Sequence, residues 1–270
     1  MRILLKIGAG MMLLAIILVG VSAAMLRAHA EGGVAANIPG SHAMKTETRT
    51  VDGAVTVINA NGPVDLVLHQ GATPAMQVIA EERLLPRIRT RQQGNTLEID
   101  FQDSLFHSSH PMRIELTLPK LEQLSLHGSG DARVSGFSGD KVVLTLRGSG
   151  DMNFDGVYQH VTASTMGSGD LDMTTGSGAD ADLSILGSGA ITASGQNKST
   201  KVRIMGSGDL NTENLHTDDL KLDVMGSGDS SVYATKSVEI NLHGSGDVSV
   251  RGNPAQRNVN RMGSGDISWD

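Results

Sequence analysis

A tetrapeptide that recurs through the second half of the chain limits the folds available to it. Gly-Ser-Gly-Asp, with Ala in place of Asp in one copy, begins at Gly128, Gly148, Gly167, Gly187, Gly206, Gly226, Gly244 and Gly263. Neighbouring copies are separated by 18 to 20 residues. A further Gly-Ser-Gly begins at Gly176, between two copies and out of phase with them. A repeat of this length is typical of proteins that stack one short structural unit on the next.

The residues that flank each copy alternate between apolar and polar types. The position four before the first Gly is always apolar: Leu124, Leu144, Ala163, Leu183, Val202, Leu222, Ile240 and Val259. The next position is always polar: Ser125, Thr145, Ser164, Ser184, Arg203, Asp223, Asn241 and Asn260. The fifth residue after the first Gly is again polar in every copy. Alternation with a period of two predicts short β-strands that bury one face.

A hairpin meander and a parallel β-helix both fit this alternation. A meander does not require the same type of side chain to recur at the same position of every copy. Stacked coils do require it, because each residue lies on its equivalent in the next coil. The sequence therefore predicts an all-β fold, a right-handed parallel β-helix or solenoid with coils of about 19 residues over residues 121–270. Glycine suits a corner that recurs once per coil, because it adopts positive φ without a Cβ clash.

Residues 45–120 lack the tetrapeptide, but they also show strand-like alternation. Apolar and polar residues alternate at 64–68, 97–101 and 114–118, and Gly-containing turns separate several of these segments. The first coil of a β-helix needs protection, because an open strand edge recruits other strands. We therefore expect 45–120 to form irregular opening coils or a small β cap, with an exposed loop at 103–111.

The N-terminus has the pattern of an export signal. Basic residues at Arg2 and Lys6 precede an apolar run, and Ala28-His29-Ala30 has the small-residue pattern of a cleavage site. The run is also long enough for an uncleaved anchor, which would attach the chain to a membrane through residues 1–30. In either case we expect the rest of the chain to be exported to the periplasm or the cell surface. Residues 31–44 are expected to form a linker.

Composition excludes several kinds of function. The chain has no cysteine, which rules out disulfides, thiolate metal sites and a cysteine nucleophile. Its formal net charge of −7 makes it a poor ligand for polyanions, so nucleic acid is not expected as a partner. Aromatic residues make up only 3%, so the core must come from Val, Leu, Ile and Met.

The aspartates of the repeat form the most visible candidate binding site. A parallel stack brings them into one ladder, interrupted by Ala190: Asp131, Asp151, Asp170, Asp209, Asp229, Asp247 and Asp266. Stacked carboxylates repel one another, so hydrogen bonds from corner amides, splayed side chains or bound cations must relieve the repulsion. Capping of amides is the favoured interpretation, and calcium, which prefers repeated oxygen ligands, is the alternative.

Two further sets of residues contain side chains that commonly bind metals. The position before each first Gly holds Met or His in six copies. Soft metals bind these side chains, but a stack of flexible apolar side chains beside the corner is the favoured interpretation. His107 and His110 lie close together, but no third ligand accompanies them, so an incidental pair on a loop is favoured. The sequence therefore assigns no metal site and no cofactor.

Residues 45–270 resemble the GIN-domain family, whose members are described as heads of putative autotransporter adhesins. The resemblance is carried by the segments 62–68, 97–99, 118–121 and 126–131, and by the closing segment 262–267. It implies an exported bacterial β-helix with an adhesin-like role. Because the sequence ends directly after the last repeat, we expect this chain to act without the translocator barrel or sorting signal that such an adhesin would use.

These features predict a non-enzymatic protein that presents a repetitive polar surface to a glycan or to another surface protein. A cell-envelope protein that self-associates through its β edges is the alternative. A polysaccharide lyase or hydrolase is the third and least favoured hypothesis. Such enzymes group acidic side chains with Arg or Lys in one site, whereas the carboxylates here form one line.

Overall fold

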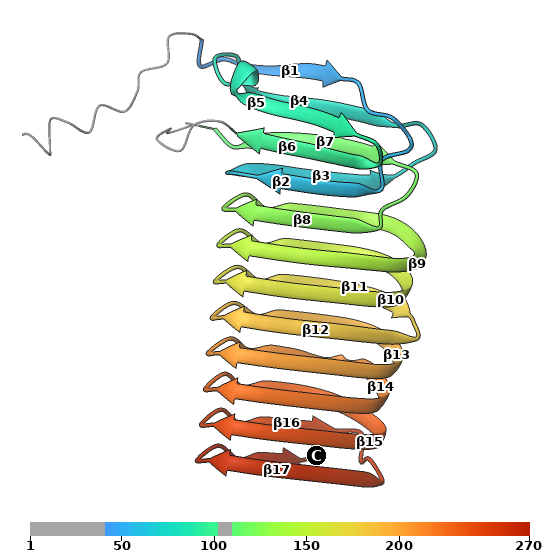
Figure 1. The fold of residues 1–270 in the computed structure, drawn as a ribbon, viewed down its shortest axis with the longest axis vertical. Coiled ribbons are helices and arrows are strands. Elements are labelled where there is room, and N and C mark those ends of the chain that lie inside the picture. Colours follow the sequence, from blue (N-terminus) through green and yellow to red (C-terminus); the bar gives the residue numbers. More distant parts are fainter. Residues whose placement is uncertain (1–40, 102–109) are drawn as a thin grey trace, which may run out of the picture. The chain divides into compact units, whose positions relative to one another are not determined.

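The computed structural model describes residues 41–101 and 110–270, and these confirm the predicted β-solenoid. Each coil of the repeat region contributes two strand segments that lie on opposite sides of a narrow core (Figure 1). The strands are β8 (Gln123–Gly128), β9 (Ala132–Gly148), β10 (Met152–Gly167), β11 (Leu171–Ser177), β12 (Asp180–Gly187), β13 (Ile191–Gly206), β14 (Leu210–Gly226), β15 (Ser230–Gly244), β16 (Val248–Arg251), β17 (Gln256–Gly263) and β18 (Ile267–Trp269).

Every coil turns at two corners. The Gly corner is the Gly-Ser-Gly-Asp tetrapeptide. The far corner is the opposite turn, at 136–140, 156–160, 175–179, 195–199, 214–218 and 234–236 of successive coils. Several strands run through it, with a shift of register at the turn itself.

All strands of the repeat region pair in parallel, and the pairing is in register with the sequence repeat. The first Gly of each copy pairs with the first Gly of the next in an unbroken series: Gly128, Gly148, Gly167, Gly187, Gly206, Gly226, Gly244 and Gly263. A hairpin meander would pair neighbouring copies antiparallel, so this alternative is wrong for residues 123–269.

Aliphatic ladders fill the core. The column four residues before each Gly is at most 1% exposed in seven coils: Leu124, Leu144, Ala163, Leu183, Val202, Leu222 and Ile240. Burial of one such leucine contributes about 1.5–3 kcal/mol, and the contribution recurs in every coil. The stack is therefore stabilised by many similar increments rather than by one compact centre.

The coil of β17 and β18 places charged residues at two positions that are apolar in the preceding coil. Arg257 and Arg261 pair with Val238 and Leu242, which are buried in the preceding coil. The guanidinium of Arg257 lies over the ring of Trp269, 4.2 Å from its centroid. Inward-pointing charged residues disfavour the addition of another strand to an edge.

The sequence predicts either irregular opening coils or a small β cap for the N-terminal region, and the structure contains both. The elements are β1 (Met44–Arg49), β2 (Val57–Asn61), β3 (Val64–Gln70), β4 (Ala75–Glu81), the 3-10 turn η1 (Leu85–Arg87), β5 (Ile88–Gln93), β6 (Thr96–Phe101) and β7 (Met112–Leu118). β2 and β3 pair in parallel with β8 and β9, and β6 and β7 pair in parallel with β2 and β3. β5, β4 and β1 then continue this end with antiparallel pairs (Figure 1).

Some expectations concern residues outside the described ranges. These are the export segment 1–30, most of the linker 31–44, and all but the end of the loop at 103–111. Within 41–101 and 110–270, the structure has no helix with the length and apolar character needed to span a bilayer.

Candidate functional site

The predicted aspartate ladder lies at the Gly corner, where each aspartate accepts a hydrogen bond from the next coil. Oδ1 of Asp131 accepts the amide N–H of Asp151 at 3.0 Å, and Oδ1 of Asp151 accepts that of Asp170 at 3.0 Å. The same bond, at 2.8–3.0 Å, recurs at six of the seven steps between Asp131 and Asp266. These bonds satisfy corner amides and place an N–H dipole between neighbouring carboxylates.

The ladder has one member that the sequence analysis missed and one gap that it noticed. Oδ1 of Asp65 accepts the amide of Asp131 at 3.1 Å, so Gly62-Pro63-Val64-Asp65 is a degenerate first copy of the corner. The spacing of Gly and Asp was the available signal, but Pro and Val replaced the diagnostic Ser and Gly. At Ala190 the acceptor is absent, and the amide of Asp209 lacks the carboxylate partner that its equivalents have.

Close stacking of backbones explains the second glycine of each copy. The first glycine adopts positive φ in every coil, for example 129° at Gly206, whereas Gly208 is outside that region. A Cβ on Gly208 would collide with the carbonyl oxygen of Gly189 in the preceding coil and with Ile185. The first glycine turns the chain and also lies against the preceding coil, since a Cβ on Gly206 would collide with the carbonyl oxygen of Gly187, whereas the second glycine is required by the close approach alone.

The Gly corner does not gather the ligands of a metal centre. Calcium takes roughly six to eight oxygen ligands. Within 41–101 and 110–270, no three or more His, Asp or Glu side chains are grouped so that they could hold an ion. Six members of this line are exposed to solvent: Asp151, Asp170, Asp209, Asp229, Asp247 and Asp266. Binding of a partner to this line stays a prediction.

An apolar stripe runs beside the Gly corner, at the position before each first Gly. Leu186, Met205, Met225 and Met262 are 37–62% exposed, so this column points outward. His110, from the predicted histidine loop, lies 3.5 Å from the buried carboxylate of Glu81, and His42 also contacts that carboxylate. His107 lies outside the described residues.

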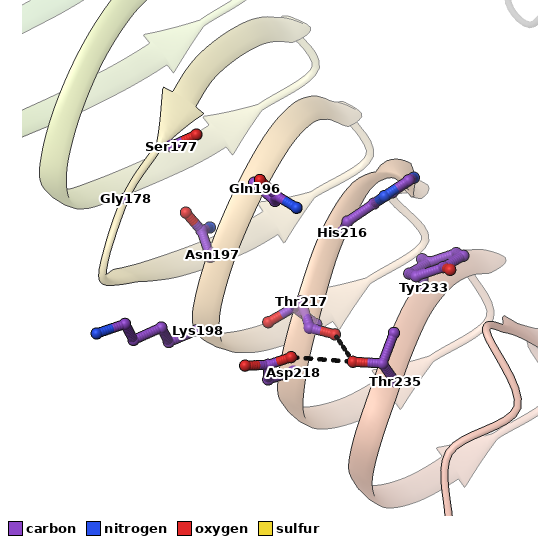
Figure 2. A pocket seen from close by; sticks show the side chains of 10 residues that line it. All are labelled: Ser177, Gly178, Gln196, Asn197, Lys198, His216, Thr217, Asp218, Tyr233 and Thr235. Atoms are coloured by element: carbon purple, nitrogen blue, oxygen red, sulfur yellow. Dashed lines mark hydrogen bonds between the residues drawn. The ribbon is translucent and has the colours of Figure 1, made fainter.

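The far corner contains a cleft that the sequence analysis did not predict as a site. It has a volume of about 320 Å³ and is lined by residues from four consecutive coils (Figure 2). Ser177 and Gly178, which belong to the out-of-phase Gly-Ser-Gly, lie at one end, and Tyr233 and Thr235 lie at the other. The irregular Gly-Ser-Gly was the signal in the sequence, because a glycine at this corner leaves space where other coils place a side chain.

Stacked rings and an unpaired amide distinguish the cleft. The rings of His216 and Tyr233 stack with centroids 4.3 Å apart and planes 16° from parallel. Asn197 is 7% exposed, and neither Nδ2 nor Oδ1 has a hydrogen-bond partner among the described residues. Tyr158, at the equivalent place two coils earlier, instead donates its hydroxyl to the carbonyl of Leu121 at 2.8 Å.

The charges at the rim are partly neutralised. Asp218 Oδ2 accepts a hydrogen bond from Lys236 at 2.8 Å, and Oδ1 accepts one from Thr235 at 3.0 Å. The bond from Lys236, followed by that from Thr235, lowers the pKa of the Asp218 carboxyl, and the bond to Asp218 raises the pKa of Lys236. Both groups are therefore charged at neutral pH. Lys198 adds a positive charge to the same rim.

Comparisons with solved structures show the same fold. A putative adhesin from Parabacteroides distasonis has a TM-score of 0.79 at 20% identity, over 84% of this chain and 97% of that chain. A putative adhesin from Parabacteroides merdae has a TM-score of 0.77 at 17% identity, over 84% of this chain and 96% of that one. A protein described as a putative lipid binding protein, also from P. distasonis, has a TM-score of 0.77 at 22% identity, over 84% and 96% of the two chains.

No curated protein matches the sequence. The model of the family described as "Putative auto-transporter adhesin, head GIN domain" matches residues 55–254. That range contains β2 to β16 and both corners of the stack. The resemblance found in the sequence is thereby confirmed, and the chain belongs to this GIN-domain family.

Proposed function

We propose that this chain is an exported, non-enzymatic, adhesin-like protein that acts in the periplasm or at the cell surface by binding a glycan or a protein. Family membership and the likeness to putative adhesins support an adhesin-like role. The pattern of the N-terminal 30 residues supports export.

The observation that carries this proposal is a straight column of small polar side chains on one outer sheet. Its members pair in register from coil to coil: Asn153, Asp172, Thr192, Asn211, Ser231, Ser249 and Ser268. Coils repeat about every 4.8 Å, so the column offers the same hydrogen-bonding groups at a constant interval. A partner that itself repeats, such as a glycan chain, can contact several coils at once and gain from multivalency.

The nearest approach to catalytic geometry supports a role without catalysis. His69 Nδ1 lies 2.8 Å from Ser135 Oγ, the distance of a base from a nucleophile. No carboxylate orients His69 among the described residues, and the pair lies on an exposed face. His160 contacts Asp180 at 2.6 Å, but no hydroxyl completes that pair. Neither arrangement supplies a nucleophile, a base and an orienting group together.

Adhesion of whole cells tests this function. We expect a strain without the gene to lose adhesion to glycan-coated or protein-coated surfaces, and the intact gene to restore it. Surface protease applied to intact cells, followed by fractionation, would separate a surface location from a periplasmic one. Unchanged adhesion of the deletion strain on every surface would contradict the adhesin-like role.

One observation favours a second candidate, self-association within the envelope. The stripe of Leu186, Met205, Met225 and Met262 leaves flexible apolar side chains in solvent along one edge. If this stripe joins copies of the chain, light scattering should show a mass that rises with concentration, and the double substitution M205Q/M225Q should return it to the monomer value. A constant monomer mass in the unmodified protein would remove this candidate.

A further inference from the structure

The far-corner cleft has the composition of a saccharide site. It contains a stacked pair of aromatic rings, two side-chain amides and several hydroxyl groups, and none of its lining side chains is aliphatic (Figure 2). We propose that this cleft binds one hexose unit of a glycan, an inference that rests on the adhesin-like function proposed above. It adds the far corner to the polar column of the outer sheet as a place where this function is carried out.

The stacked rings provide the flat face that a sugar ring needs. Tyr233 covers one face of the imidazole of His216, 4.3 Å away. The other face of the imidazole is directed along the stack, towards the coil that carries Gln196 (Figure 2). The face of an aromatic ring is negative, and the C–H groups on one side of a hexose are weakly positive, so the two surfaces attract each other.

Asn197 provides the hydrogen bonds. Its side chain is buried, and its donor and its acceptor both lack partners among the described residues. A native structure rarely leaves both ends of a buried amide unpaired, and such a group indicates an absent water or ligand. If the amide turns towards the cleft, two neighbouring hydroxyl groups of a hexose can pair with it, one accepting from Nδ2 and the other donating to Oδ1.

Gly178 leaves room for the side chain of Asn197. A Cβ at this position would lie 3.0 Å from Oδ1 of Asn197 and too close to the carbonyl oxygen of Tyr158. A side chain at 178 would therefore press on the amide of Asn197 and displace it. Gly178 and Asn197 come from successive coils, so the site exists only when the stack has formed.

The lining chemistry favours a sugar over a peptide. A peptide side chain that docks in a cleft normally requires a pocket of several aliphatic or aromatic side chains, and the lining here offers only the stacked rings of His216 and Tyr233. Asp218 is occupied by Lys236 and Thr235, so it does not repel a ligand strongly. Lys198 at the rim has no ion-pair partner among the described residues, which favours a sugar that also carries a carboxylate.

Saturation-transfer NMR and calorimetry on the purified full chain test the proposal, with methyl glucoside, methyl galactoside and glucuronate as probes. We expect dissociation constants on the order of millimolar for a single hexose, given ordinary affinity per atom. N197L should raise the dissociation constant by at least about tenfold, since two hydrogen bonds are lost. N197L should also keep or raise the melting temperature, because it removes an unpaired buried amide; a purely structural role for Asn197 would lower it.

Two further variants complete the test. H216A removes the exposed stacking face and should weaken binding of every sugar, whereas K198Q should weaken glucuronate alone. S184A, on the other sheet and outside both the cleft and the polar column, should bind like the unmodified chain. Absence of binding to all three sugars, or binding that N197L and H216A leave unchanged, would overturn the saccharide site. Neither result removes the adhesin-like function, which the deletion strain tests separately.

Discussion

The backbone amide of Asp229 donates a hydrogen bond to Oδ1 of Asp209, 2.9 Å away in the preceding coil. This contact links two residues that are 20 positions apart in the sequence, and its equivalents recur along the Gly corner. It relieves the repulsion within the line of carboxylates, because an N–H donor lies between one carboxylate and the next. The ladder is therefore a device for fixing the register of the coils.

Completion of the ladder at its gap should stabilise the chain. A190D gives the amide of Asp209 the carboxylate acceptor that its equivalents have. A hydrogen bond to a charged group contributes about 1.5–3 kcal/mol when well formed, and less at an exposed corner beside other carboxylates. We expect a higher melting temperature in heat denaturation and a higher midpoint concentration in urea denaturation. Both increases should grow with salt concentration, because salt screens the repulsion between neighbouring carboxylates.

A neutral variant separates the two effects at this corner. A190N offers the same acceptor oxygen without charge, so it should stabilise at low salt at least as well as A190D. Destabilisation by both variants at every salt concentration would show that the corner amides do not govern the ladder.

Close contact between backbones predicts a large effect at Gly208. A Cβ there meets the carbonyl oxygen of Gly189, and the N–H of Gly189 donates to the carbonyl of Gly167 in the coil before, so this backbone cannot move away alone. G208A should therefore destabilise the chain by about 1–3 kcal/mol or more, as overpacking does. S207A is the matched control, because Ser207 is exposed in the same corner, and it should change stability by less than about 0.5 kcal/mol. Equal melting temperatures for the two variants would contradict the steric argument.

Tyr158 should make stability fall in alkaline solution. Burial, with a smaller effect of Glu122, raises the pKa of its hydroxyl from 10.0 to about 12. The folded state thus favours the protonated form, so the stabilisation is complete below pH 10 and is lost as the pH rises from 10 towards 12. The shift corresponds to about 2–3 kcal/mol.

Denaturation in urea across this pH range measures the effect. Y158F should lower stability below pH 10 through loss of the bond to Leu121, but should flatten the decline above it. F154L removes a ring whose centroid lies 6.0 Å from that of Tyr158. It should lower the free energy of unfolding by the same amount at every pH, without changing its dependence on pH. A Y158F curve parallel to that of the unmodified chain would show that another group causes the alkaline loss.

Because the chain has no cysteine, the register of the stack can be measured with paired labels. Ser164 and Ser184 pair in register on adjacent coils and are partly exposed. Nitroxides at S164C and S184C should show strong spin exchange, as expected at the spacing of about 5 Å between neighbouring strands. The pair S164C and N211C, on opposite sheets, should show none. Exchange in the second pair, or its absence in the first, would contradict the parallel pairing.

The repeat region was predictable from sequence because one interaction pattern is repeated in every coil. Positions such as Leu144 and Leu183 have the same neighbours above and below, so alignment on the glycines already places them together. The N-terminal region was predicted only in outline. β2 and β3 insert between β6–β7 and β8–β9, and no local pattern reveals a strand that pairs with residues 66 positions away.

The candidate site was harder to predict than the fold, for a physical reason. The aspartate ladder is visible because it follows the repeat, yet one oxygen of most of its members accepts a backbone amide. The far-corner cleft arises where the repeat is broken, at Gly178 and Asn197. A site that depends on differences between coils cannot be found by averaging over them.

A glycan array probed with the purified full chain tests the central claim most directly, that this GIN-domain solenoid binds saccharide through its far corner. The account predicts signal on a subset of hexose-containing glycans, a drop of at least about tenfold for N197L, and unchanged signal for A190D, which alters the opposite corner. An array without signal, or one on which A190D abolishes binding and N197L does not, would contradict it.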